Sequence, residues 1–210
     1  MRKGEIVEDI KRELKKEPTT AVLMILNLLV FLVTEFTGGS QDTLHMLDCG
    51  AAYTPLILEN GEWYRLFTCM FLHFGMEHLA NNMLVLFVLG GRLERTIGKV
   101  KFLLIYFLGG IAGNICSLFL DLRSMDFAVS AGASGAVFAV MGAMIYVLLR
   151  SKGRVEDITV RQMVIMAAFS LYFGLTSSGV DNAAHIGGML SGFAIAVILY
   201  HPRKIRASVP

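Results

Sequence analysis

Residues 130–149 read SAGASGAVFAVMGAMIYVLL, in which a glycine-flanked serine, Ser134, stands at the start of an apolar run. Fifty-one residues after Ser134, a second apolar run contains Ala-His-Ile-Gly-Gly at 184–188. Polar and ionisable groups are costly in hydrocarbon, so a serine and a histidine at membrane depth indicate a functional site. The two stretches together predict a nucleophile and its base inside a lipid bilayer.

The composition around these stretches is that of a membrane protein. Apolar residues make up 55% of the 210 residues and charged residues only 17%. Concentration of the apolar residues in long runs is typical of membrane-spanning chains. The runs lie roughly at 20–37, 76–91, 102–120, 134–149, 162–178 and 183–200. We therefore predict an all-α membrane protein whose single membrane domain, residues 19–201, contains six transmembrane helices.

The distribution of lysine and arginine predicts the orientation of these helices. Of the 19 basic residues, 17 lie in the N-terminal segment, in 92–101, in 150–161 or in the C-terminal tail. The positive-inside rule then places both termini in the cytoplasm. We expect residues 1–18 to form a cytoplasmic amphipathic segment and residues 202–210 a cytoplasmic tail. The basic tracts are thus topology signals, and we expect no nucleic-acid partner.

The depth of the polar residues supports a common site. Ser134 and His185 each lie 16 residues from the cytoplasmic end of their run. At 1.5 Å per residue that is about 24 Å into a hydrocarbon core about 30 Å thick. His78 lies at about 21 Å by the same rise. Three helices therefore carry polar groups at similar depth, which predicts a recessed, water-filled cavity open to the outside.

These side chains suit acyl transfer. A serine hydroxyl needs an adjacent base, and histidine is the usual one, so we interpret Ser134 as nucleophile and His185 as base. His78 and Asn82, four residues apart on one helix face, can donate hydrogen bonds to an oxyanion. His73 is expected to organise the neighbouring loop.

Small and aromatic residues surround the predicted pair. Phe138 follows Ser134 by one turn and is expected to pack against the imidazole of His185. Asp181 is predicted to be a helix N-cap, with a role as a third catalytic residue as the alternative. Close helix contact is expected at four glycines: Gly132, Gly135, Gly188 and Gly192.

Other interpretations remain open. A transporter or channel would line a path with His78 and His185 but would spread polar residues through the whole membrane thickness. A non-catalytic protein that binds membrane clients would share the fold and need no nucleophile. The three cysteines lack metal-ligand spacing, so no metal is expected, and a disulfide between Cys49 and Cys69 is an alternative.

The motifs taken together resemble the rhomboid intramembrane serine proteases. The resemblance covers roughly residues 60–195. It rests on His73-x4-His78-x3-Asn82, Gly90-Gly91-x2-Glu94, Gly132-Ala133-Ser134-Gly135 and Ala184-His185-x2-Gly188-x3-Gly192. One departure is Trp63-Tyr64-Arg65, where the family often has adjacent tryptophan and arginine.

The resemblance implies a function and its residues. It implies a six-helix rhomboid-like bundle with a Ser134–His185 dyad, and an oxyanion hole of His78, Asn82 and the Ser134 backbone. It implies serine endopeptidase activity without metal or organic cofactor, on single-pass membrane proteins cut within or near their spanning helices. Residues 38–75 would be a membrane-entering loop, and 162–178 would border lateral substrate access. A prokaryotic cytoplasmic membrane is the expected location.

Overall fold

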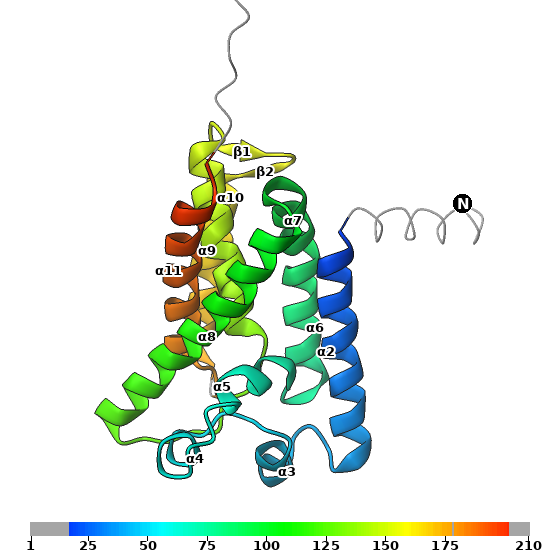
Figure 1. Ribbon diagram of the computed structural model, residues 1–210, viewed down its shortest axis with the longest axis vertical. Helices are drawn as coiled ribbons and strands as arrows, with labels where there is room; N and C mark the ends of the chain where they lie inside the picture. The colour runs from blue at the N-terminus through cyan, green and yellow to red at the C-terminus, as the bar shows by residue number, and fades with distance from the viewer. Residues whose placement is uncertain (1–16, 178, 202–210) are drawn as a thin grey trace, which may run out of the picture.

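The computed structural model describes residues 17–177 and 179–201. The predictions of an amphipathic segment and of a cytoplasmic tail fall mainly on residues 1–16 and 202–210, which lie outside the described residues. Long helices run side by side along most of the molecule (Figure 1). A two-stranded hairpin lies at one end and three short helices lie at the other, so the two ends of the bundle differ in structure.

The first four predicted apolar runs lie within helical segments, whereas the runs 162–178 and 183–200 extend past the last helical residues, Thr176 and Leu199. The long segments among the described residues are α2 (Pro18–Thr37), α6 (Gly75–Val85) continued by the π-helical turn η2 (Leu86–Gly90) and α7 (Gly91–Ile97), α8 (Lys99–Ser124), α9 (Ser134–Arg150), α10 (Val160–Thr176) and α11 (Asn182–Leu199). In length and hydropathy α2, α8 and α11 each suffice to cross a membrane, whereas α9 and α10 are shorter apolar helices. The outward side of the bundle is also apolar: Val33, Phe119 and Phe173 are each at least 60% exposed. This surface suits contact with lipid rather than with water.

The helical segment made of α6, η2 and α7 extends past the predicted run, and a residue near its end caps the start of α2. The run was predicted to end at residue 91, but helix continues to Ile97. Glu94 is buried, and its carboxylate accepts hydrogen bonds from the backbone N–H groups of Thr19 and Thr20 and from the Thr20 hydroxyl. These N–H groups belong to the first turn of α2, where backbone donors lack partners within the helix.

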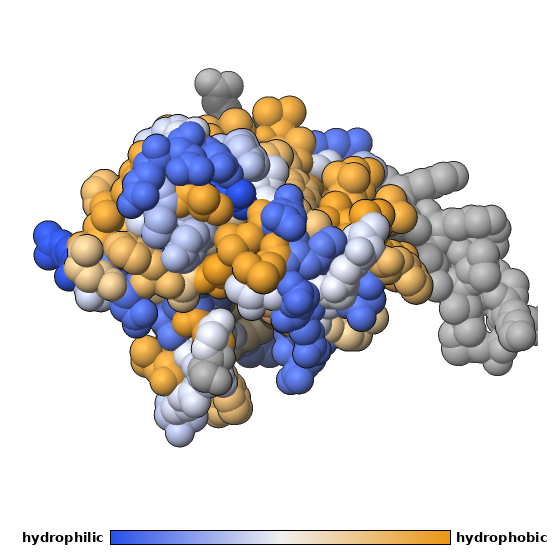
Figure 2. All heavy atoms as spheres, turned by 90° about the horizontal axis from the view of Figure 1, so that it is seen from below, coloured by the Kyte–Doolittle hydropathy of each residue, from blue (hydrophilic) through white to orange (hydrophobic). Residues whose placement is uncertain are grey.

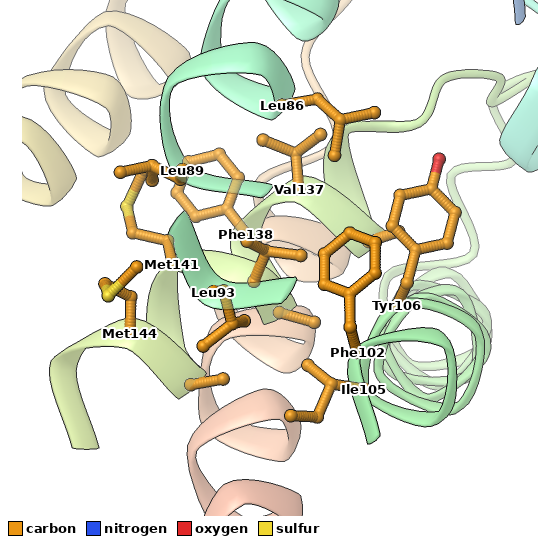
Figure 3. Close-up of a cluster of buried hydrophobic side chains, with 14 of the residues drawn as sticks. Leu86, Leu89, Leu93, Phe102, Ile105, Tyr106, Val137, Phe138, Met141 and Met144 are labelled. Atoms are coloured by element: carbon orange, nitrogen blue, oxygen red, sulfur yellow. The ribbon is translucent and has the colours of Figure 1, made fainter. Parts of the chain in front are cut away.

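The main core lies between α6, η2 and α7 on one side and α8 and α9 on the other. Figure 3 shows its side chains pointing toward one another from these elements. Its buried side chains include Leu86, Leu89, Leu93, Phe102, Ile105, Tyr106, Val137, Phe138, Met141 and Met144. The core therefore fixes α9, which begins with Ser134, against two neighbouring helical segments.

Glycines bring α11 into direct backbone contact with α9 and α8. A Cβ atom at Gly188 would collide with the carbonyl oxygen of Gly135, and one at Gly192 with that of Ala139. On α8, a Cβ atom at Gly113 would lie 2.6 Å from the carbonyl oxygen of Ala184. The predicted approach of the helix bearing His185 to the helix bearing Ser134 is thus observed, and it depends on the absence of side chains.

Residues 38–75 form a structured loop. It contains α3 (Thr43–Asp48), α4 (Thr54–Glu59), α5 (Arg65–Thr68) and the 3-10 turn η1 (Cys69–Phe71). Seen from this end, the surface mixes hydrophilic and hydrophobic residues (Figure 2). The three cysteines are free, which contradicts the Cys49–Cys69 disulfide considered as an alternative.

Arg65 holds this loop together. Its guanidinium donates to the carbonyl oxygens of Leu47 and Ala51 at 2.7 and 2.9 Å and pairs with Glu62 at 2.6 Å. The hydrogen bond from Arg65 holds the pKa of the Glu62 carboxyl below its ordinary value. Trp63 and Tyr64, by contrast, are more than half exposed. In the sequence Trp63-Tyr64-Arg65, which differs from the usual family pattern, the arginine therefore anchors the loop. Its two aromatic neighbours are exposed.

At the opposite end, a hairpin connects α9 to α10. Its strands are β1 (Arg154–Val155) and β2 (Ile158–Thr159). Between them, Asp157 receives two hydrogen bonds from Arg92 of α7, and Glu156 receives two from Arg95. The hairpin is thereby attached to α7 by ion pairs.

Candidate active site

Ser134 is the first residue of α9, and the backbone that leads into it is fixed by contacts from other segments. The N–H of Gly132 donates to the carbonyl of Cys69 at 2.9 Å, and Ser130 pairs with Ala52 through two backbone hydrogen bonds. The N–H of Ala133 donates to His73 Nε2 at 3.3 Å. The prediction that the helix begins at the serine is confirmed. A hydroxyl at this position lies beside backbone N–H groups that are free to bind an anion.

His185 lies in the first turn of α11 and faces α9. Its imidazole stacks on the ring of Phe138, with ring centroids 4.2 Å apart and an interplanar angle of 12°. The residue is 8% exposed, and its Nδ1 has no hydrogen-bond partner among residues 17–177 and 179–201. The expected packing of Phe138 against the imidazole is therefore observed. Since Phe138 is one helical turn after Ser134, the imidazole lies near the start of α9.

Gly132 lies between His78 of α6 and Ser134 of α9. A Cβ atom on Gly132 would lie 2.6 Å from His78 Cε1, 2.8 Å from His78 Nε2 and 3.5 Å from Ser134 Oγ. The φ angle of Gly132 is +152°, which L side chains rarely adopt. Glycine is thus required here for two reasons, and its Cα brings the His78 ring and the Ser134 hydroxyl to one side of the chain.

His73 and Asn82 contact the same region in different ways. The fully buried His73 ring meets the His78 ring edge-on at 5.2 Å and accepts from the Ala133 N–H, which agrees with its expected role as a loop organiser. Asn82 is also buried, and its Nδ2 donates to the His78 carbonyl at 3.0 Å, a bond within its own helix. One amide hydrogen of Asn82 is therefore engaged by backbone, and the second is available to another acceptor.

Asp181 is the N-cap of α11, as predicted, because its Oδ1 accepts from the Ala184 N–H at 2.9 Å. Its Oδ2 accepts from the hydroxyls of Ser117 and Ser130 at 2.6 and 2.8 Å. None of these bonds is to the His185 imidazole, whose Nδ1 has no partner among the described residues, which argues against the alternative of a third catalytic residue.

Sequence reasoning missed Ser117 and Ser130. They line, with Asp181, a small cavity that also contains Ala52, Thr54 and Asp121. A cavity at Ser134 itself stays a prediction. One signal was present in the sequence: Ser130 precedes Ser134 by four residues, and Asp181 precedes His185 by four.

The comparison with protein families decides the classification. The sequence model of the Rhomboid domain matches residues 60–202, which is more than half of the chain. This chain belongs to the rhomboid family. The match includes every residue of the site described above, from His73 to Gly192.

Similar proteins occur in bacteria and in a plant, Arabidopsis thaliana, where they are named RHOMBOID-like proteins. The rhomboid protease GluP of Bacillus subtilis is 39% identical over 188 residues, which is 89% of this chain but 36% of GluP. The rhomboid protease AarA of Providencia stuartii is 33% identical over 214 aligned residues, covering 90% of this chain and 75% of AarA. YdcA of Bacillus subtilis is 28% identical over 203 residues, covering 95% and 97% of the two chains. This rhomboid chain therefore spans about a third of GluP but nearly all of YdcA.

Proposed function

We propose that this rhomboid chain is an intramembrane serine endopeptidase with a Ser134–His185 dyad. The observation that carries the proposal is the contact of α9 with α11, where glycine backbones touch and the His185 ring stacks one turn from the serine. The names of GluP and AarA as rhomboid proteases support the same activity. The site belongs to a domain of six membrane-spanning helices with both termini in the cytoplasm.

The reaction proceeds in two halves. His185 takes the proton from Ser134 Oγ, which attacks the carbonyl carbon of the scissile peptide bond. His78, Asn82 and the Ser134 N–H donate hydrogen bonds to the oxyanion. The C–N bond then breaks as His185 gives its proton to the leaving amine. Water attacks the acyl ester by the same route, and Ser134 leaves with its proton restored.

The substrates are single-pass membrane proteins, cut within or near their spanning helices. A helical peptide bond is shielded by its own hydrogen bonds, so the substrate must unwind locally before attack. Glycine and proline near the scissile bond lower the cost of unwinding, because they are the weakest helix formers. The bacterial relatives favour the cell membrane of a bacterium as the location.

The test is cleavage of a single-span reporter by purified protein in lipid vesicles. Ser134→Ala and His185→Ala are each expected to lower the rate at least about a thousandfold, since members of a catalytic unit act together. Thermal unfolding of the variants controls for folding. Cleavage that persists in folded Ser134→Ala protein would refute the dyad.

A serine-directed fluorophosphonate separates the proposal from its alternative. A protease is expected to be labelled on Ser134, and labelling should need His185 because the base activates the hydroxyl. Folded wild-type protein that is neither labelled nor active on the reporter would instead favour a non-catalytic protein that binds membrane clients.

A further inference from the structure

Asp181 receives hydrogen bonds from three separate segments of the chain. Its Oδ2 accepts from Ser117 of α8 at 2.6 Å and from Ser130 at 2.8 Å, and its Oδ1 accepts from the Ala184 N–H of α11 at 2.9 Å. Hydrogen bonds to an ionised carboxylate are shorter and stronger than neutral ones. Through these three hydrogen bonds the carboxylate connects α8, α11 and the segment that leads into α9.

Ser130 and Asp181 have the same sequence spacing from the two residues of the proposed catalytic pair. Ser130 lies four residues before Ser134, and Asp181 lies four residues before His185. The backbone of Ser130 is itself fixed to Ala52 by two hydrogen bonds of 2.8 and 2.9 Å. A bond between Ser130 and Asp181 thus joins the backbone that delivers the nucleophile to the backbone that delivers the base. Ser117 ties this bond to α8.

We propose that Asp181, Ser117 and Ser130 form a positioning clamp that sets the separation of Ser134 Oγ and the His185 imidazole. The proposal rests on the proposed protease function and names residues that act through others, since the hydrogen bonds of their side chains are made to one another and to the Ala184 N–H, and not to the imidazole. Gly188 and Gly192 already bring α9 and α11 together along their lengths. The clamp acts at the ends of these helices, where the chain enters each one. A displacement of about 1 Å between reacting groups costs about a hundredfold in rate, so a small loosening here is measurable.

The same cavity contains a matched control. Asp121 of α8 accepts a hydrogen bond from the Thr54 hydroxyl at 2.6 Å, so this pair has the same chemistry and similar burial. Thr54 belongs to α4 and is joined neither to the segment before Ser134 nor to α11. Thr54→Val removes a hydroxyl–carboxylate bond from the cavity without releasing the clamp.

The experiment measures three quantities on the full chain in lipid vesicles. They are kcat and KM for the reporter and the rate constant for fluorophosphonate labelling of Ser134. The labelling rate depends on activation of the hydroxyl and not on binding of a protein substrate. The variants are Ser117→Ala, Ser130→Ala, Asp181→Ala and Asp181→Asn, beside wild type and Thr54→Val, each checked by thermal unfolding.

The clamp predicts a graded pattern. Asp181→Ala should lower kcat and the labelling rate together by about tenfold to a hundredfold, with KM unchanged. Asp181→Asn should recover part of the rate, because its carbonyl oxygen can cap α11 and its Nδ2 amide can donate to the Ser117 and Ser130 hydroxyls, which then accept. Ser130→Ala added to Asp181→Ala should cause no further loss, since both variants remove the same bond.

Several outcomes would overturn the clamp. One is wild-type kcat and labelling in folded Asp181→Ala protein, and another is an equal loss in Thr54→Val. If Asp181→Ala does not fold, Ser117→Ala and Ser130→Ala decide, because they keep the helix cap, and wild-type rates in both exclude the clamp. Failure of wild type itself to cut or to be labelled would remove the proposed function and the clamp with it, whereas normal wild-type activity with unaffected variants removes the clamp alone.

Discussion

Helices α9 and α10 follow one another in the chain, have 17 residues each and are both apolar. They differ in how much of each helix is buried in the protein. Twelve residues of α9 are buried inside the protein, against three of α10. On α10, Phe169, Tyr172 and Leu175 are each at least 59% exposed. Two apolar helices of equal length are thus placed differently, one largely buried in the protein and the other largely exposed.

The attachments of the two helices differ in kind as well as in number. Helix α9 packs along its length against α8, α11 and the segment from α6 to α7. Helix α10 is fixed by polar contacts at its ends. Its start follows the hairpin attached to Arg92 and Arg95, and near its end the carbonyl of Gly174 accepts from Asn182 Nδ2 at 2.9 Å. The helix that carries the proposed nucleophile is therefore fixed by packing along its length, whereas its neighbour places only Met163 and Ala167 in the main core and has polar contacts at its ends.

The largest difference between α9 and α10 is expected in the free energy of unfolding when one side chain of each helix is truncated. Met144 of α9 is fully buried, so Met144→Ala should lower the free energy of unfolding by about 2–5 kcal/mol through the cavity that it leaves. Phe173→Ala on the exposed side of α10 should change it by less than about 0.5 kcal/mol. Unfolding titrations in mild detergent measure both, and similar losses would contradict the contrast.

A methyl group at the contact between α9 and α11 is expected to have the next largest effect. In Gly188→Ala the new Cβ atom would collide with the Gly135 carbonyl, so the helices must separate at a cost of about 1–3 kcal/mol. Cleavage should fall about a hundredfold because the imidazole moves away from the serine. Ile186→Ala, on the exposed side of α11, is the control and should retain activity. An active Gly188→Ala protein would show that the close contact is not needed.

Loss of the Asn182 amide should loosen α10 with a smaller effect on stability. Asn182→Ala removes the hydrogen bond to the Gly174 carbonyl, a cost of about 1 kcal/mol. Hydrogen exchange should become faster in residues 170–177 and stay unchanged in α9. Asn60→Ala, which removes only a long 3.5 Å contact with Glu62, serves as the control. Faster exchange throughout α9 would mean that the two helices are not held independently.

Acid and salt should weaken the contacts at the start of α10, where the hairpin is attached to α7 by ion pairs. The Arg92 guanidinium holds the pKa of the Asp157 carboxyl below its ordinary value of 3.8. Because this folded-state pKa is lowered, the pair contributes fully above pH 3.8 and its contribution is lost as the pH falls through the lowered pKa. Exchange at 154–162 should therefore quicken in acid and in about 1 M salt, which screens exposed charges. In Arg92→Gln the salt effect at these residues should shrink, and an unchanged effect would exclude this pair as its cause.

Local patterns account for what could be predicted. The apolar runs predicted the positions of the long helices, and the Gly-x-Ser-Gly sequence predicted that α9 begins at Ser134. The N-cap at Asp181 followed from its place before a helix, and the stacking of Phe138 on His185 followed from the one-turn spacing of Phe138 from Ser134 together with the predicted serine–histidine pair. Helix periodicity and capping depend on neighbours within a few residues, which is why sequence alone is informative about them.

Contacts between distant segments were decided only by the tertiary structure. The hydrophobicity of α9 and α10 did not show which helix is buried, because hydrophobicity does not tell a residue buried in protein from one facing lipid. Nor did it show that Arg65 anchors the loop through the carbonyls of Leu47 and Ala51, or that Asp181 joins Ser117 to Ser130. Backbone carbonyls carry no sequence signature, and a serine or an aspartate has many available partners. The chain thus determines its helices and its reactive residues locally, while packing determines which helix is held firmly enough to present them.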